Sequence, residues 1–332
     1  IKIMAGMNIA ERYIPQDGKI SLRYEGRKID IRVSTVPTLY GESVVMRILD
    51  KSQLRLDFNT LGIRPELQAS MDDLLAKPHG ILLNTGPTGS GKTTTLYASL
   101  TRIFDATKKI ITIEDPVEYE LQGINQIPVN AKRGLTFASG LRSILRQDPD
   151  IVLVGEIRDG ETAEIAIRSA LTGHLILSTL HTNDAISSIG RLVDMGTEPY
   201  LVASVLEGLL AQRLGRRICD HCKTQVPMPD DIASRIRSEE VATFGGQVWV
   251  GQGCDKCNNS GYRGRVGFFE LLRIQGDLRR AIADGAKSAD MAEALPESFR
   301  TMRQDGMDRA REGVTTIPEV LRATQDAEEI FD

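Results

Sequence analysis

Short apolar runs alternate with longer helical patterns through residues 58–215. Three of these runs are Gly80–Thr85, Lys109–Ile113 and Ile151–Val154, and helical patterns lie between them. Runs of this length without alternating polar positions are typical of strands that are buried on both faces. The repeated order of strand and helix predicts a parallel α/β sheet covered by helices. We therefore predict an α/β core over residues 58–215.

The stretch before this core has a different pattern. Lys19–Tyr24 and Lys28–Val33 alternate polar and apolar positions, and Gly41–Leu49 continues as a further strand. Alternation with a period of two is typical of strands with one buried face. Because the chain opens at Ile1 in the middle of a pattern, we expect an N-terminal part to precede it. Residues 1–57 are therefore interpreted as the C-terminal part of a small α/β domain.

The pattern after residue 198 predicts helices in three places. Pro199–Leu214 has the periodicity of an amphipathic helix, and a second helix is expected near Asp230–Thr243. Residues 263–332 are expected to be mainly helical. We therefore predict a separate cysteine-containing subdomain over residues 216–262, followed by a helical C-terminal region over 263–332.

The segment Gly86–Thr93 lies between the predicted strand Gly80–Thr85 and the start of a predicted helix. Its sequence, GPTGSGKT, fits the phosphate-binding-loop pattern of two glycines flanking four residues and followed by Lys and Thr. The glycines let successive N–H groups face one anion, and the helix N-terminus adds partial positive charge. We predict ATP and Mg²⁺ as ligands, with Lys92 facing the β- and γ-phosphates and the Thr93 hydroxyl holding the metal. The candidate nucleotide-binding residues are Gly86, Thr88, Gly89, Ser90, Gly91, Lys92, Thr93 and Thr94.

Acidic residues follow two of the predicted strands. Glu114 comes directly after Lys109–Ile113, and Glu156 follows Ile151–Val154 at the place where a Walker B carboxylate is expected. Ligands of parallel α/β sheets bind at the carboxyl ends of the strands. Gly155 occupies the usual aspartate position, so the sequence leaves two assignments open. We assign Glu114 to the attacking water and Glu156 to Mg²⁺, and the reverse assignment is the alternative.

Two of the four histidines in the chain, His174 and His181, bracket a predicted strand within Thr172–Asn183. A lone histidine is usually structural. A pair at the ends of one strand in a nucleotide-binding sheet favours a sensor of the γ-phosphate instead. We therefore include His181 among the candidate catalytic residues.

The four cysteines of the chain form two Cys-x-x-Cys pairs. Each pair can supply two thiolates from one tight turn, and four thiolates complete the tetrahedral coordination that Zn²⁺ prefers in closed, structural sites. His221 lies inside the first pair, but four thiolates suffice. The candidate zinc ligands are Cys219, Cys222, Cys254 and Cys257.

The composition is that of an ordinary globular protein. The chain has 332 residues, of which 41% are hydrophobic and 26% charged, and its net charge is −4. The acidic balance and the aromatic content of 5% count against nucleic-acid binding as the main function. No apolar run approaches the roughly 20 residues needed to span a bilayer.

Together these motifs resemble those of the ATPases of the type II secretion and type IV pilus assembly family. The resemblance covers nearly the whole chain, and its motifs are highly specific in this order. They are Ile14–Ile20, Gly86–Thr94, Thr112–Glu118, Leu141–Asp150, Gly155–Asp159, Leu171–Asn183 and Gly306–Arg322.

The resemblance implies a hexameric motor with a RecA-like ATPase core, preceded by part of a PAS-like domain. It implies that ATP hydrolysis powers the assembly of pilins or pseudopilins, and that Arg32 and Arg47 approach the nucleotide from the preceding domain. The tetracysteine zinc site is typical of the extension and assembly branch. The implied partners are an inner-membrane platform protein and other components of the machinery, without nucleic acid. The implied location is cytoplasmic and peripheral at the inner membrane, through these partners.

Two other functions fit the sequence less well. A nucleic-acid translocase on a RecA-like core is disfavoured by the acidic charge and the few aromatic residues. A non-hydrolysing scaffold gated by ATP is disfavoured by Glu114 and Glu156, because binding alone does not need two acids at the strand ends. The residues do not decide between a secretion system and a pilus system.

Overall fold

The computed structural model describes residues 1–50 and 56–324, and the chain divides into two compact units, 1–55 and 56–332. The predicted boundary of the first domain at residue 57 depends on residues 51–55, which lie outside the described residues. The same holds for the predicted helical region where it covers residues 325–332. Each unit is described by itself below.

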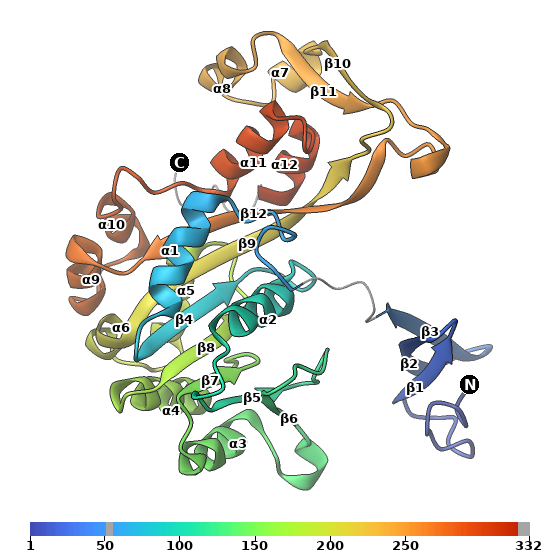
Figure 1. Cartoon of the computed structure of the whole chain (residues 1–332), viewed down its shortest axis with the longest axis vertical. Helices are drawn as coiled ribbons and strands as arrows, with labels where there is room; N and C mark the ends of the chain where they lie inside the picture. Colours follow the sequence, from blue (N-terminus) through green and yellow to red (C-terminus); the bar gives the residue numbers. More distant parts are fainter. Residues whose placement is uncertain (51–55, 325–332) are drawn as a thin grey trace. The chain divides into compact units, whose positions relative to one another are not determined.

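The first unit contains a three-stranded antiparallel sheet in the order β1-β2-β3. The strands are β1 (Gln16–Tyr24), β2 (Arg27–Thr38) and β3 (Gly41–Asp50), shown in blue in Figure 1. Each contains one of the three predicted strands, and β1 and β2 extend beyond the predicted bounds. Ile20 and Val33 pack with Ala5 in a small core, as expected for a sheet with one buried face.

The second unit is built on a seven-stranded sheet in the order β12-β9-β4-β8-β7-β5-β6 (Figure 1). All neighbouring strands are parallel except β12, which runs antiparallel to β9. The predicted parallel α/β core is confirmed. The strands are β4 (Gly80–Thr85), β5 (Ile110–Glu114), β6 (Asn125–Pro128), β7 (Ile151–Val154), β8 (Leu175–Leu180), β9 (Leu206–Ile218) and β12 (Tyr262–Arg273).

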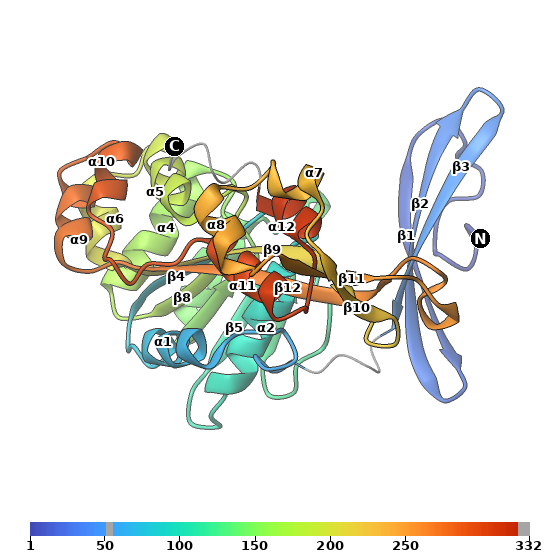
Figure 2. The same cartoon turned by 90° about the horizontal axis from the view of Figure 1, so that it is seen from above.

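Helices cover both faces of this sheet (Figure 2). Ile81 and Leu83 pack in one hydrophobic cluster, whereas Leu82 packs in the other, because successive side chains of a strand point to opposite faces. One face carries α1 (Pro65–Leu75) and α2 (Lys92–Ile103). The opposite face carries α3 (Phe137–Ile144), α4 (Gly160–Leu171), α5 (Ala185–Asp194) and α6 (Pro199–Val205).

The predicted helix Pro199–Leu214 is wrong in its second half. Helix α6 ends at Val205, and the chain continues as the long strand β9. This strand lies between β4 and β12 in the interior of the sheet, and Leu206–Arg213 is buried throughout. A Cβ on Gly208 would lie 2.7 Å from the Leu74 side chain, so the glycine lets α1 pack closely on the strand. Pairing with distant strands thus overrides the local helical periodicity.

The predicted mainly helical region 263–332 is also wrong at its start. Residues Tyr262–Arg273 form β12, whose central residues Val266–Glu270 are buried against the sheet. Strand pairing with β9 places these residues in the core, which a helix at the surface would not do. The helices follow in the described part of the region: α9 (Gly276–Ala283), α10 (Ser288–Glu293), α11 (Met302–Arg311) and α12 (Ile317–Thr324).

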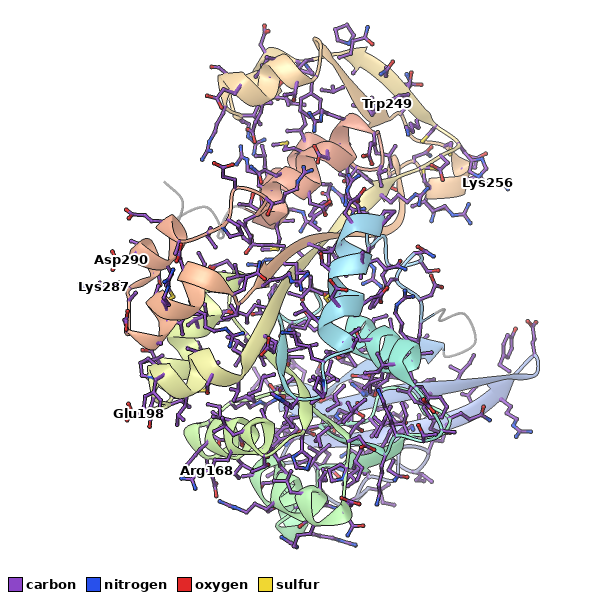
Figure 3. The ribbon with its side chains drawn as sticks, turned by 60° about the vertical axis from the view of Figure 1, so that its left-hand side comes forward. Arg168, Glu198, Trp249, Lys256, Lys287 and Asp290 are labelled. Carbon is purple, nitrogen blue, oxygen red and sulfur yellow. The ribbon has the colours of Figure 1, made fainter. Side chains whose placement is uncertain are left out.

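The segment between the cysteine pairs forms a small structure of its own. Strands β10 (Lys223–Pro227) and β11 (Gln247–Gly251) pair antiparallel. Two short helices, α7 (Asp230–Ala233) and α8 (Ser238–Thr243), replace the single predicted helix. Figure 3 labels Trp249 on β11, whose ring lies 4.4 Å from the Lys223 ammonium. Among the described residues, none of the helices combines the length and hydrophobicity required to cross a membrane.

Candidate functional site

The phosphate loop connects β4 to α2, as predicted. Gly86, Gly89 and Gly91 have φ angles of +144°, +81° and +93°, which side-chain-bearing residues rarely adopt. Gly91 is the N-cap of α2, and the helix begins at Lys92. The N-terminal N–H groups of a twelve-residue helix therefore open onto the loop. This is the geometry of an anion-binding loop.

Lys92 is held against the loop backbone. Its side-chain Nζ donates to the carbonyl oxygens of Gly86 at 2.7 Å and Pro87 at 3.0 Å. Burial lowers the pKa of Lys92 to about 8, although the Glu156 carboxylate acts in the opposite direction. The loop thus concentrates a poorly solvated positive charge where the motif predicts phosphates.

Two hydroxyls of the loop suit a phosphate and a metal ion. The Oγ of Ser90 is buried and has no hydrogen-bond partner in the described part of the chain. Thr93 is exposed at the first turn of α2. Buried hydroxyls are normally paired, so an oxygen-rich ligand at the loop would satisfy Ser90. The loop residues therefore fit a Mg²⁺-bound nucleotide.

Glu156 and His181 come together next to this loop. They follow β7 and β8, which are neighbours in the sheet. Oε2 of Glu156 lies 3.3 Å from Nε2 of His181, and the other oxygen pairs with Arg158. Burial, followed by the charge of Lys92, lowers the pKa of His181. The structure thus brings Glu156, His181 and Lys92 into one electrostatic cluster.

Glu114 ends β5 and is almost fully buried, with 3% of its surface exposed. Its carboxylate accepts hydrogen bonds from the Tyr97 hydroxyl, from Thr112 Oγ1 at 2.5 Å and from Gln126 Nε2 at 3.2 Å. Burial and the Glu114 carboxylate together raise the pKa of Tyr97. Because Tyr97 belongs to α2, the helix that starts at the phosphate loop also fixes the orientation of Glu114.

The second histidine of the predicted pair lies elsewhere. His174 precedes the amino end of β8, and its Nδ1 donates to the Ser169 carbonyl oxygen at 2.9 Å. His181 follows the carboxyl end of the same strand. The two histidines are thus separated by the length of the strand, and His174 belongs to a structural contact with the end of α4.

Strand β9 adds residues that the sequence did not single out for the site. The Arg213 guanidinium donates to Asn183 Oδ1 at 2.9 Å, and its charge contributes to lowering the pKa of Lys92. Gln212 contacts the phosphate loop itself. Because Pro199–Leu214 was predicted to be a helix, the sequence did not place either residue beside the phosphate loop. The local signal for a strand was weak, because Glu207 and Gly208 interrupt the apolar positions between 205 and 211.

Arg32 and Arg47 are direct neighbours in the first unit. They face each other across β2 and β3, and Lys19 on β1 lies opposite Arg32. Residues that are directly opposite in an antiparallel pair project from the same face. The sheet therefore carries a row of three cations.

The four cysteines form one cluster. Their sulfur atoms all lie within 4.8 Å of one another. The Sγ atoms of Cys219 and Cys254, and those of Cys222 and Cys257, are each 3.9 Å apart. Spacings of this size match four thiolates around a single ion at about 2.3 Å from each sulfur. The donor set therefore fits a tetrahedral metal.

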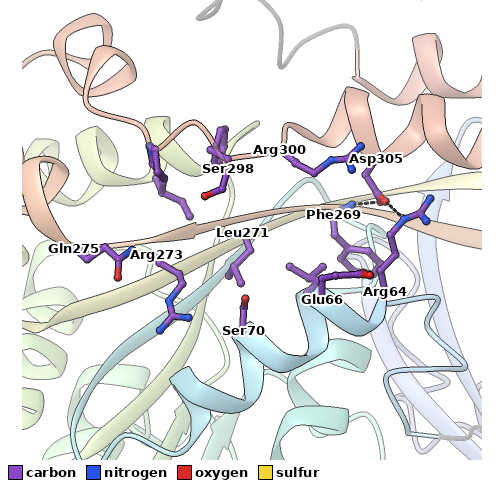
Figure 4. A pocket seen from close by; sticks show the side chains of 14 residues that line it. Arg64, Glu66, Ser70, Phe269, Leu271, Arg273, Gln275, Ser298, Arg300 and Asp305 are labelled. Atoms are coloured by element: carbon purple, nitrogen blue, oxygen red, sulfur yellow. Dashed lines mark hydrogen bonds and ion pairs between the residues drawn. The ribbon is translucent and has the colours of Figure 1, made fainter. Parts of the chain in front are cut away.

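A cavity of about 410 Å³ lies away from the predicted site residues. It is bounded by α1, β12 and the segment before α11 (Figure 4). Asp305 lies at one end, where its carboxylate accepts hydrogen bonds from Arg64 Nε at 2.9 Å and from the Phe269 N–H at 3.0 Å. The charged groups at this end are thus engaged in the contact between α1 and α11.

Comparison with known proteins gives consistent matches over most of the chain. A family model described as type II/IV secretion system protein matches residues 1–322. The type II secretion system protein E of Klebsiella pneumoniae is 53% identical over 325 residues, which are 98% of this chain and 65% of that protein. The type IV pilus assembly ATPase PilB of Thermus thermophilus is 47% identical over 325 residues, or 98% of this chain and 37% of that protein. The chain therefore spans less than two thirds of the length of these relatives.

A solved structure shares the fold. The crystal structure of the pilus retraction motor PilT with bound ADP aligns with a TM-score of 0.69 and 29% identity. The alignment covers 96% of this chain and 79% of that chain. The predicted α/β fold with a phosphate-loop core is therefore that of a known nucleotide-binding motor.

Proposed function

The chain belongs to the family of type II/IV secretion system proteins, and on this premise we propose that it is the ATPase part of a hexameric motor. It hydrolyses ATP to power the assembly of pilins or pseudopilins in type II secretion or type IV pilus biogenesis. The observation that carries this proposal is the phosphate loop with Lys92 beside the contact between Glu156 and His181. Relatives named for type II secretion, one of them 53% identical, and a relative named for pilus assembly, 47% identical, support these two settings.

The loop residues bind the nucleotide in this proposal. The backbone N–H groups of Thr88–Lys92 surround the β-phosphate, and Lys92 turns from the Gly86 and Pro87 carbonyls to the β- and γ-phosphates. Thr93 and Glu156 would hold Mg²⁺, directly or through its water. When bound, the metal neutralises charge on the phosphates.

Glu114 orients the attacking water. Its hydrogen bonds from Tyr97, Thr112 and Gln126 hold the carboxylate in one direction, which suits a group that must position a small nucleophile. His181 is assigned to sensing the γ-phosphate, because it lies 3.3 Å from Glu156 beside the loop. The Mg²⁺ dependence of turnover in variants of Glu114 and Glu156 distinguishes this assignment from the reverse one.

Arg32 and Arg47 stabilise the charge of the γ-phosphate during transfer. Their placement side by side on one sheet face supports a joint role, and arginines in this role are common in phosphoryl transfer. Through these arginines the small domain would bind the nucleotide, and hydrolysis would end this contact. The loss of this contact drives the rotation of one domain against the other.

The tetracysteine cluster binds Zn²⁺ as a structural ion. All four ligands belong to the protein, so the site has no open position for catalysis. It stabilises the subdomain over 216–262, which links β9 to β12.

The motor works at the cytoplasmic side of the inner membrane. Its partners are an inner-membrane platform protein and other components of the secretion or pilus machinery, and membrane association occurs through them. Nucleic acid is not among the proposed partners.

An ATPase assay combined with native mass measurement tests the proposal. The chain should release phosphate from Mg·ATP and assemble as a hexamer, whereas Lys92→Ala should lose turnover because the charge facing the phosphates is gone. Turnover by Lys92→Ala at the unmodified rate contradicts the assignment of the phosphate loop. DNA added to the same assay should leave the rate unchanged.

A further inference from the structure

Gln212 lies next to the phosphate loop although it is remote in sequence. It is on β9, one residue after Ala211, which pairs with Thr85 at the end of β4. Thr85 is the last residue before Gly86. The side chain of Gln212 is buried, with 2% of the residue exposed. A buried amide at this position needs partners for both of its polar atoms.

Both partners belong to the phosphate loop or to the strand that leads into it. The Gln212 Nε2 donates to the Ser90 carbonyl oxygen at 2.6 Å, and its Oε1 accepts from Asn84 Nδ2 at 2.8 Å. Asn84 Nδ2 also lies 3.4 Å from the Lys92 carbonyl oxygen. The Gln212 amide therefore bridges Asn84, which lies two positions before the loop, and Ser90, which precedes the last glycine of the loop.

The loop glycines leave the space that Gln212 occupies. A Cβ on Gly86 would collide with the Gln212 carbonyl oxygen, and a Cβ on Gly91 would lie 3.0 Å from the Gln212 Nε2. Contacts this close require a neighbour to move. Gly86 and Gly91 thus serve two purposes. They adopt backbone angles that other residues rarely adopt, and their lack of a side chain lets β9 approach the loop.

The bond to Ser90 fixes the direction of a peptide unit. The Ser90 carbonyl and the Gly91 N–H belong to one planar trans peptide group, in which the C=O and N–H bonds point in opposite directions. A donor that holds the Ser90 oxygen toward β9 therefore aims the Gly91 N–H away from β9. A flipped peptide would instead present a carbonyl oxygen to an anion and repel it.

We propose that Gln212 is a positioning residue for nucleotide binding, which holds the Ser90–Gly91 peptide so that its N–H faces the phosphates. The inference rests on the proposed ATP binding and names a residue outside the phosphate-loop motif on which that binding depends. Gln212 acts through the loop backbone and does not touch the nucleotide. Its effect falls on ATP and ADP alike, because the loop surrounds the β-phosphate that both nucleotides carry.

The test compares Gln212→Met with the matched control Gln225→Met. Methionine keeps the volume of glutamine and removes both hydrogen bonds, and Gln225 is an exposed strand residue on β10. Titration with fluorescent ATP and ADP analogues should give a Kd about tenfold higher for Gln212→Met, as expected when the hydrogen bond that holds the Ser90 carbonyl oxygen is lost. The control should bind like the unmodified chain. Hydrogen exchange should become faster in the peptide that contains Gly91, while the peptide that contains β4 stays protected.

A purely structural role predicts a different result. In that case Gln212→Met lowers the melting temperature without nucleotide, but the folded protein binds ATP with an unchanged Kd, and this outcome overturns the inference. Gln212→Asn provides a second variant, since it keeps a buried amide that is too short to reach Ser90. It should show the same rise in Kd, and unchanged binding by Gln212→Asn also refutes the role.

Lys92→Ala in the same titration separates this inference from the proposed function. If the unmodified chain binds neither nucleotide, both the proposed function and the role of Gln212 are refuted. If Lys92→Ala weakens binding while both Gln212 variants bind normally, the phosphate-loop assignment stands and only the role of Gln212 is wrong.

Discussion

Replacement of Lys92 by Met should abolish nucleotide binding and at the same time stabilise the nucleotide-free protein. Lys92 is 8% exposed, and its burial lowers its pKa from 10.5 to about 8. A pKa difference of one unit corresponds to about 1.4 kcal/mol. Keeping this side chain charged therefore costs the folded state about 3 kcal/mol at neutral pH. The variant removes that cost.

Part of the gain is offset by lost hydrogen bonds. Lys92 Nζ donates to the Gly86 and Pro87 carbonyl oxygens, and each bond contributes about 1 kcal/mol. We therefore expect Lys92→Met to raise the free energy of unfolding by about 1–2 kcal/mol at pH 7, or the melting temperature by about 2–5 °C. An apolar side chain at position 92 would thus make the protein more stable, but phosphate binding needs the positive charge of Lys92.

The sign of the pH dependence follows from proton binding. Between about pH 8 and pH 10.5 the folded state has lost the Lys92 proton and the unfolded state still holds it. The unfolded state then binds more protons, so the stability of the unmodified chain rises with pH across this window. The advantage of Lys92→Met should therefore be largest near pH 7 and should shrink toward about pH 10.

Denaturant unfolding followed by the fluorescence of Trp249, the single tryptophan, measures the effect in the second unit. The exposed Lys132→Met serves as the matched control and should leave stability within about 0.5 kcal/mol of the unmodified chain. A Lys92→Met protein that is less stable than the unmodified chain at pH 7 without nucleotide refutes the reasoning. The same conclusion follows if its stability difference does not change with pH.

Three further predictions test the proposed chemistry. Glu114→Gln should retain Mg·ATP binding and lose turnover, whereas Glu156→Gln should alter the Mg²⁺ dependence of turnover; a changed metal dependence only in Glu114→Gln reverses the two roles. Metal analysis of protein purified without chelator should find about one Zn²⁺ per chain, and Cys254→Ser should destabilise residues 216–262 while ATP binding persists; protein without zinc contradicts the site. Arg32→Ala and Arg47→Ala should each cut turnover far more than they lower the nucleotide-free melting temperature, since an arginine at the γ-phosphate is worth about 10³–10⁵ in rate in other enzymes. Unchanged turnover in both variants removes them from the site, and partial recovery in hexamers that mix Arg47→Ala with a phosphate-loop variant places Arg47 at a neighbour's nucleotide.

Local patterns predicted the parts of the site that depend on neighbours in sequence. The phosphate loop follows from glycines at fixed spacing, because their backbone angles are a property of single residues. The strand ends near Glu114 and Glu156 follow from short apolar runs, one of which ends directly before Glu114 and the other of which ends two residues before Glu156. The cysteine cluster follows from the two Cys-x-x-Cys turns, since each turn places two sulfurs together before the chain folds further.

The sequence by itself determined the α/β class, the phosphate loop and the two cysteine pairs of this protein. Only the tertiary structure decided that β9 and β12 are strands, that Gln212 holds the Ser90 peptide, and that His181 meets Glu156. Strands gain their hydrogen bonds from partners far away in the chain, so the same apolar run is compatible with a helix until those partners are known. Side chains from β4, β7, β8 and β9 become neighbours at one edge only after the order of the strands in the sheet is fixed. That order depends on the packing of both sheet faces against their helices, which is a property of the whole unit and not of any segment within it.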